Sequence, residues 1–198
     1  MTENKGLVRK KLGISIDYLI LGKVVFTMFN YLEDMIFEAA DDLKHSCSYY
    51  PGNNQLFKVD HDLPRLSQKD ADIFHCHVAR LLFANKRARP NIQVCVAFLC
   101  TRVKSPTEQD YKKLGRVISY LLETVHLPLV IGVDNSRTLT WNIDASFVVH
   151  PDCKSHTGAC LTLGYGSVLS ISVKQKINTK SPTKAELVGV DGAITFVM

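Results

Sequence analysis

The sequence predicts a mixed α+β fold in which strands near both ends of the chain enclose a helical middle. Apolar and polar side chains alternate over residues 11–30 and again after Pro128, which is the spacing of half-buried strands. Between residues 67 and 125, apolar side chains instead recur at helical spacing. The composition of the 198 residues, 46% hydrophobic and 22% charged, is typical of a folded globular chain.

The first part of the chain is predicted to form a β-hairpin and one helix. The alternation over residues 11–30 is interrupted at Gly22, which favours a hairpin turn there. A helix is expected over residues 31–44, with Asn30 as its N-cap. Residues 45–66 contain a cluster of proline, glycine and asparagine and are predicted to form a surface loop.

Three helices are predicted to follow in the segment 67–128. Ser67 is the expected N-cap of the first helix. Pro90 is expected to open the second, at a position where its missing N–H costs nothing. Ser105 and Pro106 are expected to begin the third helix, with Ser105 as the cap of a capping box.

After Pro128 the period changes from helical to strand-like. Four short strands and one helix are predicted there, in the order LVIGV, TLTWNIDASFV, GACLTLG, SVLSISVKQ and a helix from Ser181-Pro182 through KAELVGV. The turn after the first strand is expected at Asp134-Asn135-Ser136. The last helix is expected to have barely two turns, which predicts a truncated final domain.

The sequence shows no signal-peptide-like or membrane-spanning segment, and its cysteine pattern favours free thiols. Together these features predict an intracellular protein without specifying a compartment. No apolar run approaches the ~18–20 residues of a membrane span. The segment Met1–Lys11 is polar and basic, unlike a signal peptide. The six cysteines form no CxxC pair, so free thiols are expected. Cys76 lies between two histidines, but no second pair has ligand spacing, which disfavours a zinc site.

Positive charge is concentrated in the second half of the chain. Residues 80–116 carry nine basic and two acidic side chains. Such a surface favours a polyanion such as nucleic acid, whereas the alternative is a solvated helix face rich in Lys and Arg. The candidate nucleic-acid-binding residues are Lys86, Arg87, Arg89, Lys174, Lys176 and Lys180.

Two carboxylates in the C-terminal part are candidates for a metal site. Asp144 lies near the end of an otherwise apolar strand, where burying an unpaired carboxylate is costly. Glu186 is the only acidic residue between positions 153 and 190. A helix packed across the intervening strands can place Glu186 beside Asp144, and a cation between them would relieve their repulsion. In the alternative interpretation, Asp144 is a turn or cap residue and Glu186 is a solvated helix residue.

Four blocks of sequence follow one another in order: LGISIDYLILGKVVFTMFNYLEDM (12–35), QKDADIFHCHVARLLFANKRAR (68–89), PTEQDYKKLGRVISYLLETVHLPL (106–129) and the stretch from WNIDASF to KAELVGVDGA (141–193). Together they resemble the Pol polyprotein of copia-type (Pseudoviridae) LTR retrotransposons. The first is similar to the strands and helix that close the reverse transcriptase palm. The last is similar to the opening of the ribonuclease H domain.

This resemblance implies a domain organisation. Residues 1–44 would be the end of a polymerase palm, with its hairpin, and 45–66 a loop. Residues 67–128 would be thumb-like or connection helices. Residues 129–198 would be a truncated ribonuclease H-like β-β-β-α unit.

The resemblance also assigns roles to the two carboxylates. Asp144 of WNIDASF matches the first, and Glu186 of KAEL the second, of four catalytic carboxylates that bind two Mg²⁺ ions in the family. The remaining two would lie beyond Met198, and the polymerase YxDD motif would lie upstream of Met1. At the helix start, Lys184 replaces the usual capping-box glutamate, which costs about 0.5–1 kcal/mol of local helix stability.

The function implied is that of a fragment. The intact parent carries out RNA-directed DNA synthesis and degrades the RNA strand of RNA–DNA hybrids, with Mg²⁺ as cofactor. The fragment itself is expected to be inactive and to bind Mg²⁺ weakly or not at all. Its expected partners are an RNA–DNA hybrid or a template–primer duplex and the remainder of the polyprotein, with no membrane. The alternative is a non-catalytic nucleic-acid-binding module or a degenerate element remnant.

Overall fold

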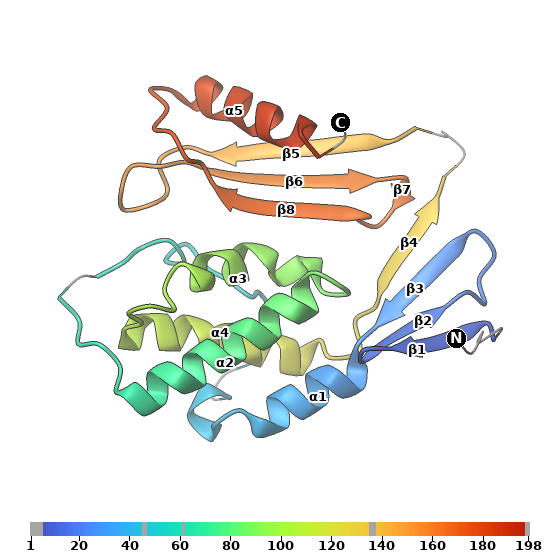
Figure 1. Ribbon diagram of the computed structural model, residues 1–198, viewed down its shortest axis with the longest axis horizontal. Coiled ribbons are helices and arrows are strands. Elements are labelled where there is room, and N and C mark those ends of the chain that lie inside the picture. Colours follow the sequence, from blue (N-terminus) through green and yellow to red (C-terminus); the bar gives the residue numbers. More distant parts are fainter. Residues whose placement is uncertain (1–5, 45–46, 61, 135–137, 197–198) are drawn as a thin grey trace.

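The chain forms a helical body with one antiparallel sheet beside it and a second sheet stacked on it (Figure 1). A computed structural model describes residues 6–44, 47–60, 62–134 and 138–196. Within these residues the helices are α1 (Phe29–Glu38), α2 (Gln68–Asn85), α3 (Gln93–Cys100), α4 (Glu108–Glu123) and α5 (Pro182–Ile194), with the 3₁₀ turns η1 (Asp41–Leu43) and η2 (Pro90–Ile92). The strands are β1 (Val8–Lys11), β2 (Ile14–Asp17), β3 (Lys23–Thr27), β4 (Leu129–Val133), β5 (Thr140–Ser146), β6 (His156–Thr162), β7 (Gly164–Tyr165) and β8 (Leu169–Lys174). The predicted mixed class is therefore confirmed.

The larger sheet joins both ends of the chain, in the order β1-β2-β3-β4-β7. The predicted hairpin is present as β2 and β3, and Gly22 adopts a φ of +76° in the turn between them. Strand β1 was not predicted, because its side chains are all exposed and carry no alternating apolar pattern. Strand β4 pairs with β3, Val25 opposite Val130, although the expected domain boundary at residue 129 separates these strands. The predicted turn after β4 lies largely outside the described residues.

Helix α1 begins earlier than predicted, and the assignment of Asn30 as its N-cap is wrong. The N-cap is Met28, and the N–H of Leu32 donates to the Met28 carbonyl. Both Met28 and Leu32 are buried in the core, so their packing determines where the helix starts. The predicted helix 31–44 also ends early, at Glu38, and η1 then carries Leu43 into the core.

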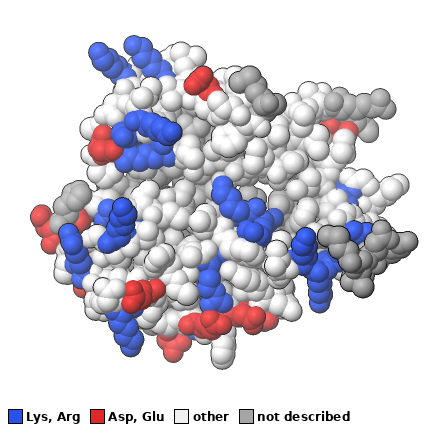
Figure 2. Space-filling model, viewed as in Figure 1, with Lys and Arg blue, Asp and Glu red and all other residues white. Residues whose placement is uncertain are grey.

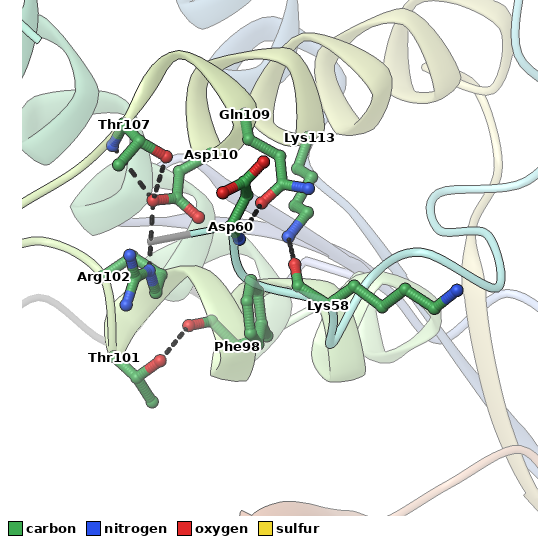
Figure 3. A network of polar contacts seen from close by, with 9 residues as sticks. All are labelled: Lys58, Asp60, Phe98, Thr101, Arg102, Thr107, Gln109, Asp110 and Lys113. Carbon is green, nitrogen blue, oxygen red and sulfur yellow. Dashed lines mark hydrogen bonds and ion pairs between the residues drawn. The ribbon is translucent and has the colours of Figure 1, made fainter. Parts of the chain in front are cut away.

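The helical middle matches the prediction in its order and in two of its three starts. Ser67 caps α2, its hydroxyl accepting from the N–H of Asp70 at 3.2 Å. Pro90 opens η2, which leads directly into α3. Helix α4, however, is capped by Thr107 and not by Ser105, since Thr107 and the buried Asp110 form the capping box (Figure 3).

The main core lies where α1, α2, α3 and α4 meet. Its members are apolar side chains from all four helices and from the turns and loops that connect them. The largest fully buried ones are Phe74, Phe98, Leu32, Met35, Leu43, Leu81, Ile92, Leu99, Leu114, Ile118 and Leu121. All six cysteines are free, as expected, and burial raises the pKa of the Cys95 thiol to about 12. Among the described residues, no helix has both the length and the apolarity that a membrane crossing requires.

The smaller sheet, in the order β5-β6-β8, carries α5 on its outer face (Figure 1). Small residues let this helix lie close to the strands: Ala185, Gly189 and Ala193 are buried against them. The helix begins where predicted, and Ser181 caps it by accepting from the N–H of Lys184 at 3.3 Å. The helix has 13 residues, so the expectation of barely two turns is wrong.

Candidate carboxylate site and basic surface

Glu186 lies against the edge of the sheet that carries α5. Strand β5 is the edge strand, so its outer backbone groups have no neighbouring strand among the described residues. The Oε1 atom of Glu186 accepts a hydrogen bond from the N–H of Ala145 at 3.2 Å. Helix α5 therefore positions its only half-buried carboxylate next to the residue that follows Asp144.

Asp144 is exposed, so its predicted burial is wrong. Along β5 the side chains alternate, and Trp141, Ile143 and Ala145 are the ones that pack inward. Asp144 stands opposite Gly158, which stands opposite Ser172, and residues paired in this way share one face of a sheet. All three line a groove of about 440 Å³ whose other wall comes from η2 and α3, including Gln93.

The two carboxylates therefore reach β5 from different sides. Glu186 approaches the strand edge from the α5 face, whereas Asp144 leaves the strand on the face toward α3. Within the described part of the chain, no three side chains of His, Cys, Asp or Glu type form a metal-binding group. Carboxylates suit Mg²⁺, but two of them supply only part of its six oxygen ligands. Two carboxylates that approach a strand from different sides are an incomplete donor set for Mg²⁺.

Arg89 cannot contact a phosphate, and that part of the prediction is wrong. Its side chain is only 1% exposed. The guanidinium donates to the Thr124 carbonyl at 2.9 Å, to the Thr124 hydroxyl at 2.6 Å and to Asn91 Oδ1 at 3.2 Å. Arg89 is therefore a structural residue that ties the end of α2 to the end of α4.

The other two candidates near the end of α2 remain accessible. Lys86 is exposed. Arg87 is half-buried: its guanidinium lies over the Phe83 ring, 3.6 Å from the ring centre, and donates to the Phe83 carbonyl at 3.2 Å. Stacking on an aromatic ring orients a guanidinium without using all of its donors.

The lysines of the smaller sheet differ in their surroundings. Lys174 forms an ion pair with Asp152 at 2.7 Å, which also lowers the pKa of that carboxyl. Lys176 and Lys180 are exposed. On the face shown in Figure 2, Lys and Arg side chains form separate groups with Asp and Glu between them. A pocket between α2 and β8 is lined by both Lys86 and Lys174.

A buried polar cluster beside this pocket was not predicted from the sequence. His150 Nε2 lies 3.0 Å from His156 Nδ1, and His156 Nε2 lies 2.7 Å from Ser172 Oγ. The ring of Phe57 contacts both imidazoles. The only sequence signal is the close spacing of the two histidines on either side of a turn-like Pro-Asp.

Comparison of the chain with known protein families, curated proteins and solved structures found no match in any of the three. The fold and the site define a mixed α/β protein with one carboxylate on an edge strand and another on the helix that covers the sheet.

Proposed function

We propose that this chain is a segment of a copia-type retrotransposon Pol polyprotein, spanning the end of the reverse transcriptase and the first part of the ribonuclease H domain. The observation that carries the proposal is the C-terminal arrangement. The three antiparallel strands of the smaller sheet, β5, β6 and β8, are followed by a helix, with Asp144 on the first strand and Glu186 at that strand's edge. The resemblance implies this order, with one carboxylate on the first strand and one on the helix, and the preceding strands and helices suit the palm end and the thumb-like helices.

In the intact parent, bound Mg²⁺ would activate water and stabilise the leaving oxygen during cleavage of the RNA strand. Asp144 and Glu186 would contribute carboxylate ligands. The Ala145 N–H fixes the orientation of Glu186 before any ion arrives, because it holds one carboxylate oxygen at the strand edge. Two carboxylates supply only part of the ligands that a pair of Mg²⁺ ions needs, so this chain alone is proposed to be inactive.

The carboxylate proposal predicts one weak cation site. In an NMR titration with Mn²⁺, the amide signals around Asp144 and Glu186 are expected to broaden first, at millimolar ion, because few protein ligands hold the ion. Asp144→Asn or Glu186→Gln should each abolish this local broadening. Asp191→Asn, which removes an exposed carboxylate from the same helix, is the matched control and should leave it intact.

Broadening that survives both substitutions would place the ion elsewhere and contradict the assignment of these carboxylates. The same protein is expected to leave an RNA–DNA hybrid uncut with Mg²⁺ or Mn²⁺. Cleavage that either substitution abolishes would instead show that two carboxylates suffice, and that the proposed inactivity of this chain is wrong.

The second candidate function is non-catalytic binding of nucleic acid. It is favoured by the position of Lys86 and Lys174 on one pocket, which brings cations from α2 and from the smaller sheet to the same place. Lys176 and Lys180, both exposed, extend the positive charge beyond β8. Phosphates held in this way need no chemistry from the protein.

For this function, affinity for a template–primer duplex is expected to fall steeply as salt rises, because each neutralised phosphate releases counterions. The double variant Lys86→Ala, Arg87→Ala should reduce the slope of log affinity against log salt by about 2. Lys69→Ala, at the opposite end of α2, is the control and should leave the slope unchanged. Fluorescence anisotropy with a labelled duplex measures both quantities. Salt-independent binding would rule out this interface.

A further inference from the structure

The histidine cluster lies where the smaller sheet rests on the helical body. His156 and Ser172 are on β6 and β8, His150 is in the loop that follows β5, and Phe57 belongs to the segment before α2. Phe57 also contacts Phe98 of α3, edge to face, at 5.7 Å between ring centres. The two imidazoles therefore pack directly against an aromatic side chain that is anchored in the helical body.

Polar and apolar side chains both line this boundary. Gln93 of α3 donates to the carbonyl of Ser170 on β8 at 2.8 Å. Beside the histidines, the boundary contains a pocket of about 330 Å³, lined by Ala97 and Cys100 of α3 and by both imidazoles. Because a well-packed interface leaves few voids larger than a water molecule, a pocket of this size means that the sheet and the helical body are incompletely packed here.

The hydrogen bond between the imidazoles requires at least one ring nitrogen that carries no proton. Adding one proton to the pair places a positive charge among buried groups. Adding a second proton leaves two N–H donors facing each other with no acceptor between them, so the hydrogen bond breaks. Neither His150 nor His156 is more than 6% exposed. Both rings pack on the apolar ring of Phe57, which carries no negative charge to compensate a protonated imidazole.

The charged and titratable groups around the pair do not favour its protonation. Lys174 comes from β8, Lys86 is the residue after α2, and the Cys100 thiol comes from α3. The loop after β5 contributes Asp152, but this carboxylate pairs with Lys174 at 2.7 Å and with Lys154 at 3.8 Å. The cations therefore outnumber the carboxylates that face the imidazoles in the described structure.

We propose that His150 and His156 form an acid-sensitive latch, which holds the β5–β6–β8 sheet on the helical body while both rings are neutral and releases it when they are protonated. This inference does not depend on the proposed function. Its physical basis is the burial of a hydrogen-bonded imidazole pair beside a pocket at the interface between two layers.

The direction of the pH effect follows from the pKa values. Burial, with Lys174 as a second cause, lowers the pKa of His150, and burial lowers that of His156 to about 4. A released imidazole has a pKa of about 6.5. The released state therefore binds more protons between these values. The latch is fully closed above about pH 6.5 and is lost progressively as the pH falls toward about 4.

Hydrogen exchange of the full chain between pH 7.5 and pH 5, corrected for the intrinsic rate, tests the latch. Protection of β6 and β8 amides is expected to fall by about tenfold or more at pH 5, before that of the α2 core. His156→Gln keeps a hydrogen-bonding side chain that does not titrate and should flatten this pH dependence. His150→Gln is the second variant, and His75→Gln, an exposed histidine on α2, is the control.

A third buried histidine, His77 of α2, makes the order of release decisive, since burial lowers its pKa as well. Acid that loosened α2 and the sheet together would indicate general unfolding and overturn the latch. A pH response equal in wild type and in both latch variants would also overturn it. Where a variant fails to fold, the ring signals of wild-type His156 decide: titration near pH 6.5 contradicts the latch, and titration below pH 5 supports it.

Discussion

Replacing Arg89 with alanine is expected to lower the free energy of unfolding by about 3 kcal/mol. The guanidinium is fully buried and makes three hydrogen bonds, two of them to Thr124. Removing it leaves the Thr124 carbonyl and the Asn91 side chain without these donors and opens a cavity between α2 and α4. A buried acceptor that loses its partner costs about 1–3 kcal/mol.

Urea unfolding followed by circular dichroism measures this loss. Arg87→Ala is the matched control, because the side chain two residues earlier is half-buried and stacks on a ring, and its loss is expected to cost about 1 kcal/mol or less. Arg89→Met separates packing from hydrogen bonding, since it keeps most of the volume and none of the donors. Equal stability of the Arg89→Ala and Arg87→Ala proteins would show that the buried guanidinium contributes little.

Replacing Asp110 with alanine is expected to cost a similar amount, about 2–4 kcal/mol. Asp110 is fully buried at the start of α4, and its Oδ2 atom accepts three hydrogen bonds (Figure 3). The donors are the Thr107 N–H at 3.0 Å, the Thr107 hydroxyl at 3.1 Å and Arg102 Nε at 3.0 Å. The substitution therefore removes the helix cap and leaves Arg102 without this carboxylate.

Thermal unfolding of the Asp110→Ala protein, compared with that of the Glu108→Ala protein, tests this expectation. Glu108 lies in the same first turn but is exposed, so its loss should remove only a helix-dipole interaction of about 0.3–1 kcal/mol. Asp110→Asn keeps an acceptor but not the charge and is expected to fall between the two. A Glu108→Ala protein as unstable as Asp110→Ala would mean that charge at the helix end, rather than the buried bonds, stabilises α4.

The features that the sequence predicted correctly are decided by contacts within a few residues. Ser67 and Ser181 cap their helices through backbone N–H groups three residues away, so local sequence is sufficient. The start of α1 depends on the burial of Met28 against side chains that are distant in sequence. Thr107 displaces Ser105 as a cap because Asp110 also binds Arg102. Tertiary packing therefore determines where α1 and α4 begin, and local helix propensity could not predict these two starts.

The same distinction applies to the candidate site. The strand of Asp144 and the helix of Glu186 were predicted from periodicity, and the structure brings the helix onto that strand. The exposure of Asp144 and the burial of Arg89 depend on which face each element turns to its neighbours. The histidine cluster joins residues from a loop and two strands, for which the sequence offers no spacing rule.

The pairing of β3 with β4 has a consequence for biosynthesis. Val25 and its partner Val130 are more than a hundred residues apart, and the whole helical body lies between them in the chain. A ribosome adds about 5–20 residues per second, so the outer edge of β3 stays unpaired for about 5–20 seconds until β4 has been synthesised. During that time the newly made strands expose an unpaired edge to other nascent chains. Chaperone protection of the first strands would matter most in this interval, before β4 has been synthesised and has paired with β3.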